Sequence, residues 1–461
     1  MPWGTREEIA YRFHNELVAH TIRHIVNVAM QSASLLEFRF HPTYIKKLVC
    51  SVSMAKTTMR ALETWMRQTR NWKIISVRSM LSRFFQRLTM PYDSIYIREL
   101  GADPIQLGMV SSFSHVMGAF ISIPVGWLQD RYSLRRIFLI GVALSLVVSL
   151  IYASATGWVM IIPAMLLSTL AMKVGSCLTI CDVSLKSEDR SRCKGICDGV
   201  FAAPSLIAPT LAALMITQLG GIGVEGIRPL YWTQLVAGVI LFFFLATQLT
   251  EIERQNLSDN LGFMRDYREV FKKGTSLKRW IAFDVVSTFS MSMAAPFQQP
   301  FAHEIKGADQ FILGGMITAS LTIQILFSAS LGGIADRTGR KKVIYMTEPL
   351  YWASILTLVL APSAEFLIIS SILGGFRMIA SYVCMTPLMV ELVPIDYIGR
   401  WRGILGLFQA LVSIPAPIIG GIIWETIGPS YLFLIQVLVS IVVRIPLLTT
   451  IPERMRLGFE Q

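Results

Sequence analysis

Two short stretches of the chain decide its fold. Residues 126–136 are Gly-Trp-Leu-Gln-Asp-Arg-Tyr-Ser-Leu-Arg-Arg, and residues 332–342 are Gly-Gly-Ile-Ala-Asp-Arg-Thr-Gly-Arg-Lys-Lys. The stretches are 206 positions apart, and the same shift brings Gly-Ala-Asp at 101–103 onto Gly-Ala-Asp at 307–309. Self-similarity at one fixed spacing indicates an internal duplication. We therefore predict that the chain consists of two homologous halves.

The composition places these halves in a membrane. Of the 461 residues, 53% are hydrophobic and 16% are charged, whereas soluble domains carry about 25% charged residues. This balance excludes a secreted or cytosolic globular enzyme and, despite a net charge of +12, a nucleic-acid binder. Spans of about 20 apolar residues cross a bilayer. We predict twelve of them, at 74–97, 105–127, 137–155, 158–182, 195–218, 229–249, 280–300, 311–333, 343–361, 364–390, 403–424 and 430–450.

Lysine and arginine alternate strongly between the loops on the two sides. The loops around 131–136, 186–194, 254–279, 337–342 and 400–402 are rich in both, whereas the opposite loops hold only Arg98, Arg228 and Lys306. Because basic loops stay on the cytoplasmic side, we predict a multi-pass protein of the cell membrane with both termini cytoplasmic. The expected parts are an extension (1–72), a six-helix half (73–250), a middle loop (251–278), a second half (279–452) and a tail (453–461).

The two opening stretches resemble the loop signature of the major facilitator superfamily, Gly-x-x-x-Asp-Arg-x-x-x-Arg-Arg, between the second and third helices of each half. The first copy has Ser133 at the position where the family usually has glycine and the second copy has Gly339. The resemblance covers about residues 74–452. It implies an all-α membrane protein with twelve transmembrane helices in two parallel six-helix repeats. It also implies secondary transport by alternating access, and it says almost nothing about the substrate.

The resemblance further implies a cytoplasmic gating latch in each half, in which the loop Asp and Arg meet a carboxylate at the end of the fourth helix. Asp182 fits that carboxylate in the first half, and Glu391 fits its counterpart. Charge-assisted contacts of this kind can break and re-form. The alternative is that these charges only set topology. The latch residues are Gly126, Asp130, Arg131, Arg135, Arg136, Asp182, Gly332, Asp336, Arg337, Arg340, Lys341 and Glu391.

Several spans contain cations. Arg83 and Arg87 share one face of the first span, and at 1.5 Å per residue Arg87 falls near mid-bilayer. A charge facing lipid there costs several kcal/mol, so we expect this face to line an aqueous cavity. Guanidinium groups clamp carboxylate or phosphate, which favours an anionic substrate. The predicted substrate-binding residues are Arg83, Gln86, Arg87, Lys173, Arg377, Gln298 and Gln299.

Two other interpretations of these polar residues stay open. The cations can pair internally with acidic residues and hold the halves together, and Lys173, Arg377 and Arg444 can extend to the cytoplasmic surface. The glutamines suit sugar or drug recognition equally well. Coupling to protons needs a titrating group, and burial favours the neutral form of a carboxyl group. The candidates for the proton-coupling site are Asp93, Asp284 and Glu348.

The sequence thus predicts a secondary transporter, with proton-coupled movement of a small organic anion as the first hypothesis. The elements Ala208-Pro209 and Ala416-Pro417 are similar to one found in drug/proton antiporters of the superfamily, which is the second hypothesis. Close packing of small residues explains the same elements. A non-transporting membrane receptor is the third hypothesis. We expect no enzyme activity, cofactor, metal or nucleic-acid partner, and a monomer in the lipid bilayer.

Residues 1–71 are basic and amphipathic, and no window among them is apolar enough to span a membrane. Hydrophobic residues recur at helical spacing from Ile9 onward, so we predict a helical cytoplasmic extension that lies on anionic lipid. The alternative is that translation begins near Met54 or Met80.

Overall fold

The computed structural model of the chain describes residues 68–175, 193, 200–251, 271, 276–393 and 398–452. Residues 1–67 of the predicted extension, the C-terminal tail and most of the middle loop lie outside these ranges, so their interpretation stays a prediction. Within the described ranges all regular structure is helical.

The N-terminal half supplies the elements of the first six predicted spans. The first span is broken into two helices, and the fourth and fifth each begin with a 3₁₀ turn. The elements are α4 (Arg70–Thr89), α5 (Asp93–Glu99), α6 (Pro104–Arg131), α7 (Leu134–Ser154), η1 (Trp158–Met160), α8 (Ile161–Val174), η2 (Val200–Leu206), α11 (Ala208–Gln218) and α12 (Val224–Gln248).

The C-terminal half supplies the elements of the last six spans, and three of these spans contain a π-helical turn. The elements are α14 (Leu277–Ala294), η3 (Ala295–Phe297), α15 (Gln298–Pro300), η4 (Phe301–Ile305), α16 (Gln310–Thr338), α17 (Arg340–Leu360), α18 (Phe366–Ala380), η5 (Ser381–Met385), α19 (Thr386–Val390), α20 (Ile398–Ser413), α21 (Ala416–Thr426), α22 (Pro429–Val439), η7 (Ser440–Arg444) and α23 (Ile445–Thr449).

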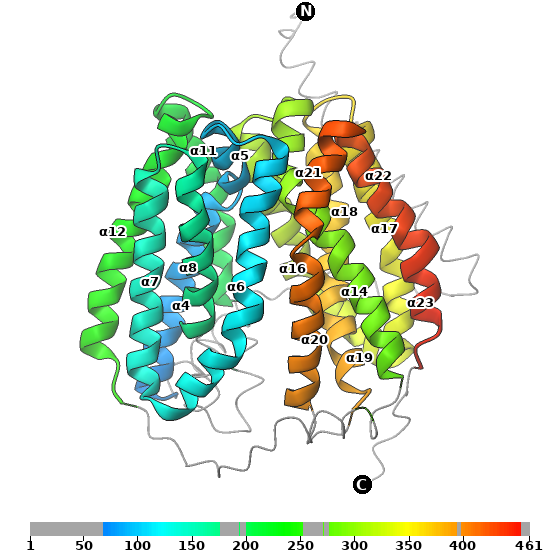
Figure 1. The fold of residues 1–461 in the computed structure, drawn as a ribbon, viewed down its shortest axis with the longest axis horizontal. Coiled ribbons are helices and arrows are strands. Elements are labelled where there is room, and N and C mark those ends of the chain that lie inside the picture. The colour runs from blue at the N-terminus through cyan, green and yellow to red at the C-terminus, as the bar shows by residue number, and fades with distance from the viewer. Residues whose placement is uncertain are drawn as a thin grey trace, which may run out of the picture. The chain divides into compact units, whose positions relative to one another are not determined.

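The lengths and hydropathy of these helices are those of membrane spans. In the described part of the chain, seven helical segments are long and apolar enough to cross a bilayer, and Trp158–Val174 and Ala202–Gln218 are shorter apolar helices. The elements form two groups of helices, coloured blue to green and light green to red in Figure 1. The prediction of an all-α, multi-pass membrane fold built from two repeats is therefore confirmed.

The repeat also determines where helices break. Pro91 lies between α4 and α5, and Pro296 lies in the 3₁₀ turn that follows α14. Pro209 and Pro417 each stand in the first turn of a new helix, α11 and α21. Proline has no backbone N–H to donate and is tolerated in the first turn of a helix, so it ends one helix and begins the next. The first and fifth helices of each half are thus discontinuous at matching places.

The two halves share a hydrophobic core near the loops that contain Gly101 and Gly307. This cluster of buried residues combines Tyr92 and Leu107 of the first half with Phe297 and Trp424 of the second. The clusters toward the other end are separate among the described residues. One contains Phe138 and other residues of the N-terminal half, and another contains residues of the C-terminal half.

Two glycines allow the halves to approach closely at the shared core. A Cβ on Gly108 of α6 would lie 2.3 Å from the carbonyl oxygen of Pro417, and a Cβ on Gly314 of α16 would lie 2.9 Å from that of Pro209. The two contacts are repeat equivalents, and α6 contacts α21 just as α16 contacts α11. Small residues at these helix crossings serve close packing.

Candidate substrate and coupling site

The cationic face predicted on the first span lies on α4. Arg83 and Arg87 are half-buried one turn apart, while Gln86 is exposed. The guanidinium of Arg87 donates to the sulfur of Met90 at 2.8 Å. It lies within electrostatic range of Arg83 and of Tyr382, a residue of η5 in the other half. Arg87 makes no ion pair with a carboxylate among the described residues.

Asp93 begins α5, directly after the break at Pro91. The hydroxyl of Tyr231 in α12 donates a hydrogen bond to Asp93 Oδ1 at 2.7 Å. Tyr231 stacks on Tyr152, with ring centroids 4.8 Å apart, and also contacts Tyr96 at 5.1 Å. Asp93 thus lies beside three tyrosines of the N-terminal half, and it forms no ion pair with a cation of the described chain.

The break in the seventh span carries the two predicted glutamines. Gln298 and Gln299 form most of α15, and α15 contacts α5 across the two halves. The Oε1 atom of Gln299 is buried and accepts no hydrogen bond within the described part of the chain. Gln299 is the repeat equivalent of Asp93, 206 positions later. The two broken helices therefore bring equivalent polar residues, one from each half, to the same region.

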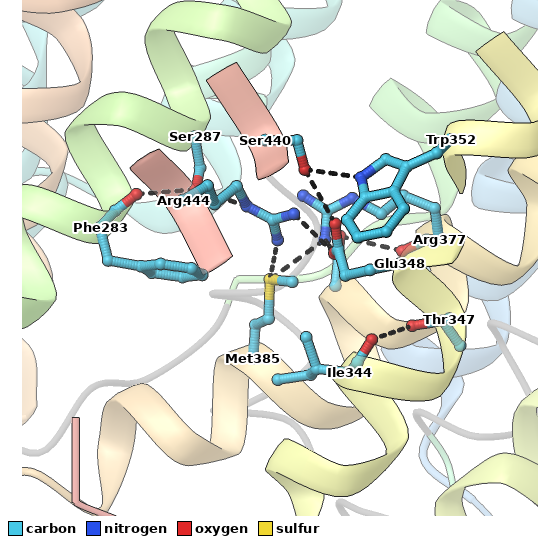
Figure 2. A network of polar contacts seen from close by, with 11 residues as sticks. Phe283, Ser287, Ile344, Thr347, Glu348, Trp352, Arg377, Met385, Ser440 and Arg444 are labelled. Carbon is cyan, nitrogen blue, oxygen red and sulfur yellow. Dashed lines mark hydrogen bonds and ion pairs between the residues drawn. The ribbon is translucent and has the colours of Figure 1, made fainter. Parts of the chain in front are cut away.

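The C-terminal half buries a cluster of charges. Arg377 Nη1 lies 3.1 Å from Glu348 Oε1, and Arg444 Nη1 lies 2.5 Å from the same oxygen. The side chains of Glu348 and Arg444 are 1% and 4% exposed. Ser440 donates to Glu348 Oε2, and Arg444 Nε donates to Ser287 Oγ. Figure 2 shows the two guanidinium groups around the carboxylate.

This cluster changes the interpretation of several predicted residues. The expectation that Arg444 extends to the cytoplasmic surface is wrong, because Arg444 points into the helix bundle and α23 continues the span beyond it. Arg377, proposed to bind substrate, and Glu348, proposed to carry a proton, form an ion pair with each other. Lys173, the near-equivalent of Arg377, is exposed near the end of α8.

The third acidic candidate, Asp284 of α14, has a neutral partner. Gln409 Nε2 of α20 donates to Asp284 Oδ2 at 2.8 Å. This contact joins the seventh and eleventh spans within the C-terminal half. Asp284 therefore forms no ion pair with the cluster around Glu348 among the described residues.

The second copy of the predicted latch contains an ion pair, while its gating role stays a prediction. Arg340 forms an ion pair with Glu391 and lies 4.0 Å from Asp336 Oδ1. Asp336 and Arg337 are exposed, and Gly332 is packed against Val383. The carboxylate at the end of the tenth span thus meets the loop arginine.

Only part of the first copy is described. Asp182 and the side chains of residues 126–131 lie outside the described residues. Arg135 Nη2 donates to the carbonyl of Ala246 at the end of α12, and its repeat equivalent Lys341 donates to the carbonyl of Ile451 after α23. Arg136 is exposed. In both halves this cation binds the last carbonyls of the sixth helix, where the helix dipole is negative.

An ion pair at the opposite end of the molecule was missed from the sequence. Arg98 Nε and Nη2 donate to the two carboxylate oxygens of Glu304 at 2.8 and 3.0 Å, and Arg98 Nη1 donates to the carbonyl of Ala102. Arg98 follows the first span and Glu304 the seventh, 206 positions apart. The repeat spacing was the available signal, but Arg98 was counted only as a loop charge.

The fold and this arrangement are those of a polytopic membrane protein with two homologous halves and polar residues at matched helix breaks. The family model of the Major Facilitator Superfamily matches residues 75–284 and 283–458. The chain belongs to this superfamily.

Two known proteins are similar to part of this chain at low sequence identity. An uncharacterised MFS-type transporter of Mycobacterium tuberculosis is 27% identical over 146 residues, which are 32% of this chain and span only 20% of that protein. One from Schizosaccharomyces pombe is 26% identical over 120 residues, which are 26% of this chain and 27% of that protein.

Solved structures share the fold. A variant of the nucleoside transporter NupG aligns with a TM-score of 0.68 at 16% identity, over 83% of this chain and 100% of that one. The D-xylose-proton symporter aligns with a TM-score of 0.63 at 13% identity, over 83% and 98%. The human organic anion transporter MFSD10 aligns with a TM-score of 0.57 at 15% identity, over 82% and 99%.

Proposed function

We propose that this protein is a secondary active transporter that moves a small organic anion by alternating access, coupled to protons. The observation that carries the proposal is the cationic face of α4. Arg87 is half-buried in a helix of the membrane domain, without a carboxylate partner in the described chain, beside Arg83 and near Tyr382 of the other half. An intramembrane cation without a protein counter-ion is a functional site by default, and guanidinium is the group that binds carboxylate or phosphate best.

A site shared between the halves suits alternating access. In the described chain the halves share a core near Gly101 and Gly307 and have separate clusters at the other end. Ion pairs lie at both ends. Arg98–Glu304 joins the two halves at one end, and Arg340–Glu391 joins α17 to the end of α19 within the C-terminal half at the other. Movement of one half against the other would exchange the end at which they are joined.

Asp93 is the residue that we assign to proton coupling. Its partner in the described structure is a neutral tyrosine hydroxyl, so the carboxyl group can gain or lose a proton without breaking an ion pair. Glu348 is less suited to this role, because its protonation would leave two buried guanidiniums without a counter-charge. Asp284 keeps a neutral partner as well and is the second candidate.

The drug/proton antiporter hypothesis rested on the proline-centred elements of the fifth and eleventh spans. The small residues there have a packing role. A Cβ on Gly420 would lie 2.2 Å from the carbonyl oxygen of Met293, and one on Gly421 would lie 2.6 Å from that of Pro104. Close packing therefore accounts for this element without a role in drug efflux. We further propose a monomer in the cell membrane, with the basic loops and both termini in the cytoplasm.

The proposal is tested with purified protein in lipid vesicles. Uptake of radiolabelled carboxylates, nucleosides and sugars would be measured with and without an inward proton gradient. Arg87→Ala should abolish uptake of the anionic substrate, and Asp93→Asn should remove the response to the gradient. Arg70→Gln, at the exposed start of the same helix, and Asp103→Asn, in an exposed loop, are the matched controls. Uptake of a neutral compound that Arg87→Ala leaves unchanged would overturn the anion assignment, and binding without uptake would support a receptor.

A further inference from the structure

The buried charge cluster of the C-terminal half is not neutral. Two guanidiniums, of Arg377 and Arg444, surround the single carboxylate of Glu348, and all three side chains are buried. Burial of an ion without a counter-charge costs several kcal/mol. The described residues around the cluster otherwise supply hydroxyl groups, aromatic faces and one thioether. Among the described residues, one positive charge is therefore left without a counter-ion.

The two guanidiniums converge on the same atom. Arg377 Nη1 lies 3.7 Å from the sulfur of Met385, and Arg444 Nη2 lies 3.8 Å from it. In Figure 2 both contacts end on this thioether, on the side of the arginines away from Ser440. A thioether is a weak acceptor and carries no charge, so it cannot balance the excess cation. Methionine is also unbranched and changes rotamer readily.

The donors are held in place by their neighbours. Ser287 fixes Arg444 through its Nε, and the ring of Phe283 lies 5.2 Å from the guanidinium carbon of Arg444. Arg377 lies over the ring of Tyr351 at 5.4 Å. Two guanidiniums held in place in this way present N–H donors that suit the oxygens of a carboxylate or phosphate group.

The cluster also lies where two spans depart from α-helical geometry. Met385 is the last residue of the π-helical turn η5, and Arg444 is the last residue of the π-helical turn η7. Single π-helical turns inside longer helices are frequently found at functional sites. The turn η5 also carries Tyr382, which is 67% exposed and lies near Arg87.

We propose that Arg377 and Arg444 form an oxyanion-binding site that the side chain of Met385 occupies in this structure. The ligand is a carboxylate or phosphate group that displaces the thioether and bridges the two guanidiniums while Glu348 stays bound. The inference rests on the proposed anion transport, because it assigns to the C-terminal half a share in binding the substrate's charged group. Arg444, which was not among the predicted substrate-binding residues, is the central residue of this site.

The test is thermal unfolding of the purified full-length chain with acetate, succinate or inorganic phosphate, against chloride at equal ionic strength. A ligand that binds the native state raises the unfolding temperature. Oxyanions should stabilise the wild type, and the concentration needed should rise at least tenfold in Arg444→Gln. That variant retains Glu348 with Arg377, a balanced pair, and should fold. Stabilisation by acetate or succinate would indicate a carboxylate site, and stabilisation by phosphate alone would indicate a site specific for phosphate.

Two further variants keep the outcomes distinct. Met385→Ala removes the thioether and should strengthen oxyanion stabilisation, whereas Met385→Leu retains the volume and should resemble the wild type. Equal stabilisation of the wild type and Arg444→Gln would overturn the second site. If that stabilisation is retained in Arg444→Gln but lost in Arg87→Ala, anion binding at α4 stands without the second site. If neither arginine matters, the proposed anion transport fails as well.

Discussion

The two halves of this protein have equivalent helices, but their charged side chains lie in different surroundings. In the N-terminal half, Arg83 and Arg87 are half-buried, and Asp93 is bound by a tyrosine hydroxyl. In the C-terminal half, two arginines are buried around Glu348. The repeat equivalents of Glu348 and Arg444, 206 positions earlier, are Val142 and Gly238.

The difference shows which features a duplication conserves in structure and which it leaves free. Two residues that allow helices to approach or break occur in both halves at matched positions, Gly108 with Gly314 and Pro209 with Pro417. Polar side chains at matched positions differ, as Asp93 and Gln299 do. Packing is thus shared between the halves, whereas the residues that can bind or move charge are distributed between them. Four substitutions test this comparison, from the largest expected effect to the smallest.

Glu348→Gln should be the most damaging change. It leaves two buried guanidiniums without their carboxylate, and breaking a buried ion pair in this way costs about 3–5 kcal/mol of the free energy of unfolding. Asp93→Asn, the comparison in the other half, retains an oxygen acceptor for Tyr231 and should cost about 1 kcal/mol or less. Denaturant-induced unfolding in detergent measures both. Equal losses in the free energy of unfolding would mean that the two carboxylates stabilise their halves to the same extent.

Gly108→Ala should separate the halves at their shared core. Its Cβ would lie 2.3 Å from a backbone oxygen, so helices must move apart, at about 1–3 kcal/mol. Gly314→Ala, with 2.9 Å to the equivalent oxygen, should cost less. Gly406→Ala has nothing within 4 Å and serves as the control. Unfolding temperature and the reactivity of a cysteine introduced at Gln106 measure the effect, and an unchanged Gly108→Ala protein would argue against the close approach.

Arg98→Gln should have a smaller effect on stability and a larger one on conformation. The pair with Glu304 is 22% and 29% exposed, and such pairs contribute about 1 kcal/mol or less. Its loss should favour separation of the halves at this end, detected as faster labelling of a cysteine placed at Gln310. The exchange Arg98→Glu with Glu304→Arg should restore slow labelling. If the exchanged protein labels as fast as the single variant, the pair does not hold this end closed.

Gln299→Leu should slightly stabilise the protein. It replaces a buried Oε1 atom that lacks a partner in the described chain, and we expect a gain of about 0.5–1 kcal/mol. Gln298→Leu is the matched control on the same helix. If Gln299 also contacts substrate, uptake falls although stability rises. A loss of stability would show that the amide has a structural partner. Gln299 would then be held by a hydrogen bond, as its repeat equivalent Asp93 is.

The fold could be predicted from the sequence because hydropathy, basic loops and a duplicated signature act along the chain. The breaks at Pro91 and Pro296 are local in the same way, since the effect of proline acts on its own turn of the helix. The pairing of charges could not be predicted. Glu348 meets Arg377 and Arg444 through helix rotation and packing, which no local pattern encodes. Arg444 was misplaced because hydropathy gave its depth along the span and not the direction of its side chain.

The Arg98–Glu304 pair also constrains how such a protein could arise. Arg98 and Glu304 occupy the same position in the two repeats, so a chain with two identical halves would bring arginine against arginine, or glutamate against glutamate, at this contact. Like charges repel. The contact therefore became attractive only after the two copies diverged. In a crowded membrane it would also discourage two N-terminal halves from associating with each other in place of their proper partner.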